Sequence, residues 1–77
     1  MVRVAGGLNV SRRKEPGGNY VAVMDRETYE RLKSTISKLG LDVEVTGNIA
    51  IVKDKSWNHM RRLMNTAREL GINVNED

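Results

Sequence analysis

The stretch Asn19-Tyr-Val-Ala-Val-Met-Asp25 decides the fold, because a similar stretch, Asn48-Ile-Ala-Ile-Val-Lys-Asp54, follows it at an offset of 29 residues. Both are continuous runs of apolar and β-branched residues, which is typical of strands buried in a sheet. Further along, Ser37-Lys-Leu-Gly-Leu-Asp-Val43 is similar to Arg68-Glu-Leu-Gly-Ile-Asn-Val74, at an offset of 31. The similarity fits an internal duplication, and it fits equally two separate strand–helix–strand units whose caps and core spacing recur. The predicted architecture is the same in both cases.

Between these anchors, each copy carries apolar residues at the spacing of one helix face. The first set is Tyr29, Leu32, Ile36 and Leu39, and the second is Trp57, Met60, Leu63, Met64, Ala67 and Leu70. Asp25 and Ser56 are expected to cap the two helix starts, with Asp54 as the competitor of Ser56. Gly40 and Gly71 are expected to end the helices in the left-handed conformation.

Two further segments, 41–46 and 72–75, alternate between apolar and polar residues, as strands with one exposed face do. The predicted order is therefore strand, helix, strand, strand, helix, strand. Right-handed crossovers in an un-knotted chain favour an α+β, ferredoxin-like βαββαβ sandwich, with antiparallel sheet order 4-1-3-2 and two helices on one face. This domain would span residues 19–77 and be built from two βαβ repeats, at 19–46 and 48–76.

Residues 1–18 are expected to lie outside this domain. Four apolar residues alternate loosely on the two sides of a Gly-Gly pair, which fits either a basic arm or a β-hairpin. They are Val2, Val4, Leu8 and Val10, around Gly6 and Gly7. Residues 11–18 are polar, basic and rich in Pro and Gly, as linkers and loops are.

The composition excludes several classes of protein. The 77 residues contain no cysteine, so neither a disulfide framework nor a thiolate metal site is possible. No apolar run approaches the roughly 18 residues of a membrane span, and the N-terminus lacks the apolar core of a signal peptide. We therefore expect a small cytoplasmic domain. No catalytic, nucleotide or metal motif is present either, so a non-enzymatic protein without cofactor or metal is expected.

The net charge of +3 is unevenly distributed. Residues 1–18 carry four basic side chains and one acidic one, whereas residues 19–77 carry nine of each. A basic segment beside a folded domain is a common device for gripping phosphates, although it can also be a solvated linker. We expect a nucleic-acid-binding module or regulator that binds DNA or RNA through this N-terminal arm. The candidate binding residues are Arg3, Arg12, Arg13, Lys14, Tyr20, Lys53, Lys55, Arg61 and Arg62.

The two central strands carry apolar residues on both faces, although the helices cover one face only. Following the repeat, one face would carry Val21, Val23, Ala50 and Val52, and the other Tyr20, Ala22, Met24, Ile49 and Ile51, with Lys53. An uncovered apolar face usually marks an interaction surface. A second copy forming a homodimer, the N-terminal hairpin, or single-stranded nucleic acid could cover it. The alternative function is thus a protein-interaction or assembly module. Its candidate interface residues are Ala22, Met24, Ile49, Ile51 and Trp57.

Val21–Asp25 also resembles the first strand of some small CRISPR-associated nucleases of this fold, which place an aspartate at the end of that strand. The resemblance implies a distant alternative, a metal-dependent nuclease that uses Asp25 across a dimer. Within one chain, Asp25 and Asp54 are not expected to meet, because antiparallel neighbours put these strand ends at opposite edges of the sheet. The RNA-recognition fold shares the predicted topology and stacks bases on aromatic residues, for which only Tyr20 stands in a suitable position.

Overall fold

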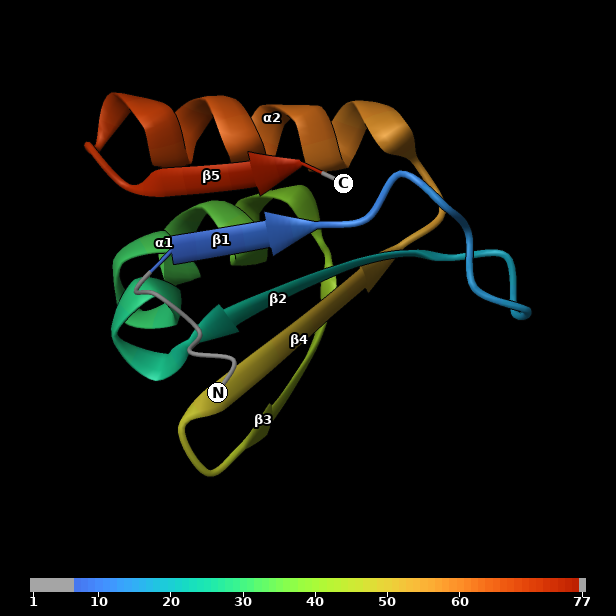
Figure 1. The fold of residues 1–77 in the computed structure, drawn as a ribbon, viewed down its shortest axis with the longest axis horizontal. Coiled ribbons are helices and arrows are strands. Elements are labelled where there is room, and N and C mark those ends of the chain that lie inside the picture. Colours follow the sequence, from blue (N-terminus) through green and yellow to red (C-terminus); the bar gives the residue numbers. More distant parts are fainter. Residues whose placement is uncertain (1–6, 77) are drawn as a thin grey trace.

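The structure is a computed structural model that describes residues 7–76. One five-stranded sheet is packed against two helices, which both lie on the same face of the sheet (Figure 1). The elements in chain order are β1 (Gly7–Val10), β2 (Tyr20–Asp25), α1 (Arg26–Leu39), β3 (Asp42–Thr46), β4 (Ile49–Asp54), α2 (Trp57–Glu69) and β5 (Asn73–Glu76). The predicted α+β class is confirmed. Among the described residues, no helix is long and apolar enough to cross a membrane.

The strand order is β3-β4-β2-β1-β5, so the predicted order 4-1-3-2 is wrong at one point. In that order the last strand would pair with β2. Instead, β1 lies between them, antiparallel to β2 and parallel to β5, which makes the sheet mixed. The reason is apolar burial, because Leu8 and Val10 on β1 are 0% and 2% exposed beneath the helices. The four predicted strands and both helices are present in the predicted order.

The sheet register decides which residues of the central strands face the helices. Ala22 lies opposite Val52 and Met24 opposite Ala50, and all four are fully buried. Side chains alternate along a strand, so the intervening residues point to the other face, which no helix covers. We call this the open face; on the central strands it carries Val21, Val23, Ile49, Ile51 and Lys53.

This register corrects two predictions. The predicted face sets grouped Val21 and Val23 with Ala50 and Val52 on one face, which corresponds to the 29-residue offset of the repeat. In the structure that offset relates residues on opposite faces: Ala22, for example, faces the helices, whereas Ile51 lies on the open face. Ala22 and Met24 are therefore core residues and not interface residues, because both are 0% exposed. Ile49 and Ile51 do lie on the open face, where Ile49 is 38% exposed.

The predicted arm or cover is wrong for residues 7–10, which form an inner strand of the sheet; the strand that the hairpin alternative expected around Leu8 and Val10 is present, and it pairs with β2. The predicted turn at Gly6-Gly7 is also wrong, since Gly7 already belongs to β1. The hairpin turns later, where the Gly18 N–H donates to the Glu15 carbonyl at 2.8 Å. The amide of Glu15 donates to the Asn19 carbonyl, also at 2.8 Å, and so closes the loop. Val2, Arg3 and Val4 lie outside the described residues.

The predicted caps are confirmed. An Asp25 carboxylate oxygen accepts from the Thr28 amide at 2.9 Å, and the Ser56 hydroxyl accepts from the His59 amide at 3.4 Å. Gly40 and Gly71 follow the two helices with φ of 69° and 78°. This left-handed conformation is unfavourable for residues that have a Cβ atom, and glycine has none. These caps fix where each helix meets the sheet.

Candidate nucleic-acid interface

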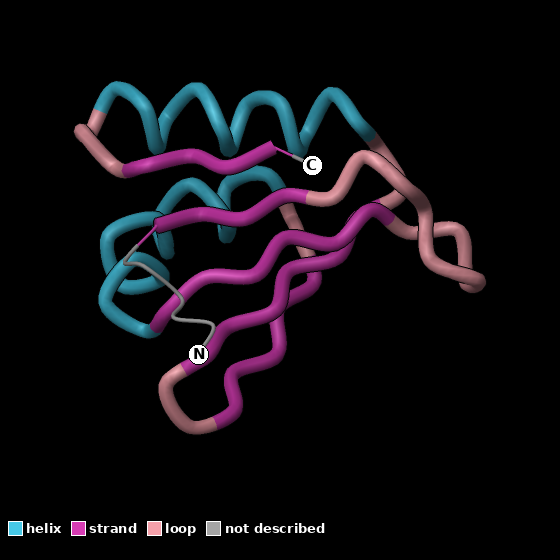
Figure 2. The backbone as a smooth tube through the Cα atoms, in the orientation of Figure 1, coloured by secondary structure: helices cyan, strands magenta, loops and turns pink. Residues whose placement is uncertain are grey.

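Two connecting segments meet at one end of the sheet. Residues 11–19 join β1 to β2, and residues 53–57 run from the last two residues of β4 to the first residue of α2. They are neighbours because Tyr20 and Asp54 are paired in the β2–β4 register. The Lys53 ammonium also lies 3.3 Å from the Glu15 carboxylate, which links the two segments directly. We call these two segments the loop end; in Figure 2 they lie among the loops at the end of the sheet opposite the turn between β3 and β4.

The loop end holds the whole net charge of the protein. Its two segments carry five basic and two acidic side chains, a net charge of +3. The rest of the chain carries eight of each and is neutral. The predicted cations come together here from both segments, namely Arg12, Arg13, Lys14, Lys53 and Lys55.

These cations differ in how they are held. Arg12 is bound to Glu76, with 2.8 Å between the arginine Nε and a carboxylate oxygen, and Lys53 is bound to Glu15. Within residues 7–76, no ion pair joins Arg13, Lys14 or Lys55 to an acidic side chain, and all three are exposed. Exposed charges without a partner remain available to an anionic ligand.

Two aromatic side chains, Tyr20 and Trp57, are in contact at the loop end. The rings of Tyr20 and Trp57 are tilted at 57° to each other, with 5.0 Å between their centroids. The Lys14 ammonium lies 5.4 Å from the Tyr20 centroid, within the range of a cation–π contact. Both rings are half-buried and pack against the core. Tyr20 thus contacts Trp57 and Lys14, and it positions that lysine.

One contact at the loop end has no counterpart in the sequence reasoning. The His59 Nδ1 lies 2.8 Å from an Asp54 carboxylate oxygen, and the same oxygen accepts from the Ser56 amide at 2.9 Å. Asp54 therefore organises the start of α2, while the Ser56 hydroxyl makes the cap. The sequence signal was the two extra residues in the second copy, which separate Asp54 from the helix.

The remaining candidates are not part of this cluster. Arg61 and Arg62 lie on the exposed surface of α2, about one turn beyond its first residue. They line a shallow depression there with Asn58 and Asn65. Arg3 lies outside the described residues.

The distant metal-site hypothesis rests on Asp25, whose carboxylate is engaged as the cap of α1. Asp25 pairs with Ile49 and Asp54 with Tyr20, so the two carboxylates lie at opposite ends of the central strands, as expected. In residues 7–76 no group of three or more histidine, cysteine or acidic residues could hold a metal ion.

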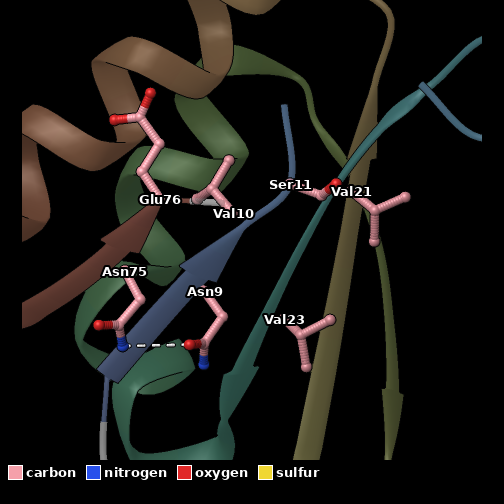
Figure 3. A pocket seen from close by; sticks show the side chains of 7 residues that line it. All are labelled: Asn9, Val10, Ser11, Val21, Val23, Asn75 and Glu76. Carbon is pink, nitrogen blue, oxygen red and sulfur yellow. Dashed lines mark hydrogen bonds between the residues drawn. The ribbon is translucent and has the colours of Figure 1, made fainter. Parts of the chain in front are cut away.

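A hollow of about 410 Å³ adjoins the loop end on the open face. Its lining includes Asn9 and Ser11, Val21 and Val23 on β2, and Asn75 on β5 (Figure 3). The side-chain amide nitrogen of Asn75 donates to the side-chain Oδ1 of Asn9 at 3.1 Å. The backbone amide of Ser11 donates to the Val21 carbonyl at 3.0 Å. The hollow thus combines an apolar side with hydrogen-bonding amides.

A comparison with models of known protein families gives no match, and neither curated proteins nor solved structures show significant similarity to this chain.

Proposed function

We propose that this protein is a small, non-enzymatic nucleic-acid-binding module that acts in the cytoplasm and binds the phosphates of DNA or RNA at the loop end. The observation that carries the proposal is the charge distribution: the net charge of +3 lies on two adjacent segments at one end of the sheet. Phosphate contacts by lysine and arginine supply most of the affinity of such modules.

The way the loop is built supports the same proposal. Backbone hydrogen bonds at Ser11, Glu15 and Gly18 close the β1–β2 loop. Arg13 and Lys14 are therefore presented from a loop that is already ordered, which lowers the entropy lost on binding. The Tyr20 ring makes a cation–π contact with Lys14, and the Arg12–Glu76 ion pair links the start of the loop to β5.

The test is fluorescence anisotropy with labelled single- and double-stranded DNA and RNA at two salt concentrations. If Arg13, Lys14 and Lys55 each contact one phosphate, the log–log salt slope should be about −3 on duplex DNA and about −2 on single strands. Removal of residues 1–18 is unsuitable as a test, because it also removes β1 from the sheet.

A matched pair of variants locates the contacts. Arg13→Gln/Lys14→Gln removes two positive charges from the loop end, and Lys33→Gln/Lys38→Gln removes two from the exposed face of α1. The first should reduce the magnitude of the duplex salt slope by about 2, and the second should leave it unchanged. Equal effects of the two variants, or no binding at low salt, would contradict the proposal. Adding Mg²⁺ or Mn²⁺ to the same assay tests the distant nuclease alternative, because a nuclease would cleave the labelled nucleic acid.

A second candidate function is a protein-interaction or assembly module in which two copies meet through the open face. The observation that favours it is the cluster of Val21, Val23, Ile49 and Ile51, which lie side by side and are covered by neither helix. Ile51→Glu should then turn a dimer into a folded monomer in sedimentation experiments. Ala22→Glu cannot serve as this test, because Ala22 is fully buried and a charge there would unfold the chain.

A further inference from the structure

The hollow on the open face is continuous with the loop end. Ser11 lines the hollow, and Arg12 and Arg13 follow it directly in the chain. The acidic residue at its rim, Glu76, lies 2.8 Å from the Arg12 guanidinium and 3.9 Å from that of Arg68. The negative charge of Glu76 is thus neutralised by two arginines, and the exposed cation Arg13 lies two residues after Ser11 in the chain.

The chemistry of the hollow suits a flat, polar-edged ligand. After the bond between Asn75 and Asn9, the Asn9 amide nitrogen keeps two donor hydrogens, and the Asn75 carbonyl oxygen is still able to accept. Val21 and Val23, both half-buried, lie across from these amides (Figure 3). A nucleobase has the matching features, because it combines an apolar ring face with donors and acceptors along its edge.

We propose that this hollow receives an unpaired nucleobase, with its ring against the two valines and its edge on Asn9 and Asn75. This inference rests on the proposed function and gives the ligand class as single-stranded nucleic acid. A base in a duplex is stacked on both faces, so its ring cannot lie against a sheet, whereas the bases of a single strand can be splayed out. The phosphates on either side of the base would lie at Arg13 and Lys14.

The same residues disfavour a second copy as the occupant of this part of the open face. A sheet-to-sheet contact would bury the side chains of Asn9 and Asn75 away from water. Burying amides without new partners costs free energy. A single-stranded ligand supplies partners for both the amides and the neighbouring cations.

The experiment compares two variants of the same residue type on the same strand. Asn75→Ala removes an amide from the hollow, and Asn73→Ala removes one two residues away that does not line it. Anisotropy is measured with single-stranded homopolymers of each base and with a duplex, at one low and one moderate salt concentration. Sedimentation and thermal unfolding are followed for each variant.

The expected result is a preference of the wild-type protein for single strands and for particular bases. Asn75→Ala should weaken single-strand binding at least about five-fold, the loss expected for one base-edge contact. The salt slope should not change, because the phosphate contacts are intact. Asn73→Ala should bind like the wild type.

Four results would overturn the inference, and they fall into three groups that can be told apart. Equal binding of single strands and duplex, or equal affinities of Asn75→Ala and Asn73→Ala, would reject the base site and leave the phosphate site standing. No binding by the wild type at low salt would reject the proposed function together with the inference. A change of oligomeric state in Asn75→Ala, without a change in nucleic-acid affinity, would assign the hollow to a second copy.

Discussion

The two strand–helix–strand halves, 19–46 and 48–76, end their helices in the same way and begin them differently. The Leu41 amide bonds to the Ile36 carbonyl at 3.1 Å, and the Ile72 amide bonds to the Ala67 carbonyl at 2.9 Å, each across a left-handed glycine. At the helix starts the halves diverge. Asp25 caps α1 directly, whereas Asp54 is two residues removed from α2 and bonds to His59 instead.

This difference between the helix starts lies at the loop end. The two extra residues in the second half bring Lys55 to the loop end and place Trp57 against Tyr20. In the part of the chain that the structure describes, the opposite end of the sheet carries the Asp25 cap, the turn between β3 and β4 and the short connection from α2 to β5. A structural role alone needs no more than the simple version found in the first half. The added residues support a functional loop end.

The return strands of the two halves also differ. β3 pairs directly with β4, but β5 is separated from β2 by β1. β1 is buried, whereas every residue of β3 is exposed. The buried inner strand β1 and the exposed edge strand β3 therefore contribute very differently to stability.

The largest effect is expected when this difference is tested with single truncations. Leu8→Ala on β1 should lower the free energy of unfolding by about 2–5 kcal/mol, because Leu8 is fully buried. Val45→Ala on β3 should cost under about 0.5 kcal/mol, because Val45 is 40% exposed. Urea unfolding measures both. Similar losses would mean that β1 is not a buried inner strand of the sheet.

An intermediate effect is expected at the two helix ends, where the halves should behave alike. Gly40→Ala and Gly71→Ala should each cost about 1–2 kcal/mol, because alanine is strained at positive φ. An added Cβ meets no atom within 4 Å at either glycine, so only the backbone conformation contributes. Thermal or urea unfolding of both variants provides the comparison. Unequal losses would show that the two helix ends are not equivalent.

The smallest effect is expected at the helix starts, where the halves should differ. Asp25→Ala should cost about 1 kcal/mol, since it removes the cap of α1. Ser56→Ala should cost less, about 0.5 kcal/mol, because the longer 3.4 Å bond is lost while Asp54 still holds the Ser56 amide. Urea unfolding again gives both values. A larger loss for Ser56→Ala would contradict the role assigned to Asp54.

Local sequence patterns predicted the helices and their caps, whereas the pairing between distant strands could not be predicted. Helical spacing and the Asp25, Ser56 and Gly40 signals act within a few residues, so α1, α2 and their caps could be predicted. The position of β1 could not, because four residues with two apolar side chains fit an arm equally well and strand pairing is set by the whole sheet. The predicted assignment of β2 and β4 residues to the two faces of the sheet was wrong, because the offset of the sequence repeat is not the register in which the strands pair.

The site shows the same division. Its cations could be predicted from the run Arg12–Lys14 and from the composition of 53–57. The bond of Arg12 to Glu76 could not, because it joins residues from opposite ends of the chain. The hollow likewise depends on β1 and β5 being neighbours, which the predicted strand order excluded.

The most direct test of the account is a titration of ¹⁵N-labelled protein with a short single-stranded oligonucleotide, followed through backbone amide chemical shifts. We expect the largest changes at residues 11–19 and 53–57, and further changes at Asn9 and Asn75. We expect none at the opposite end, around Asp25 and the Gly47–Asn48 turn. Changes centred on that opposite end or on the exposed face of α1, with the loop end unaffected, would contradict the claim that the second half and the β1–β2 loop form the binding surface.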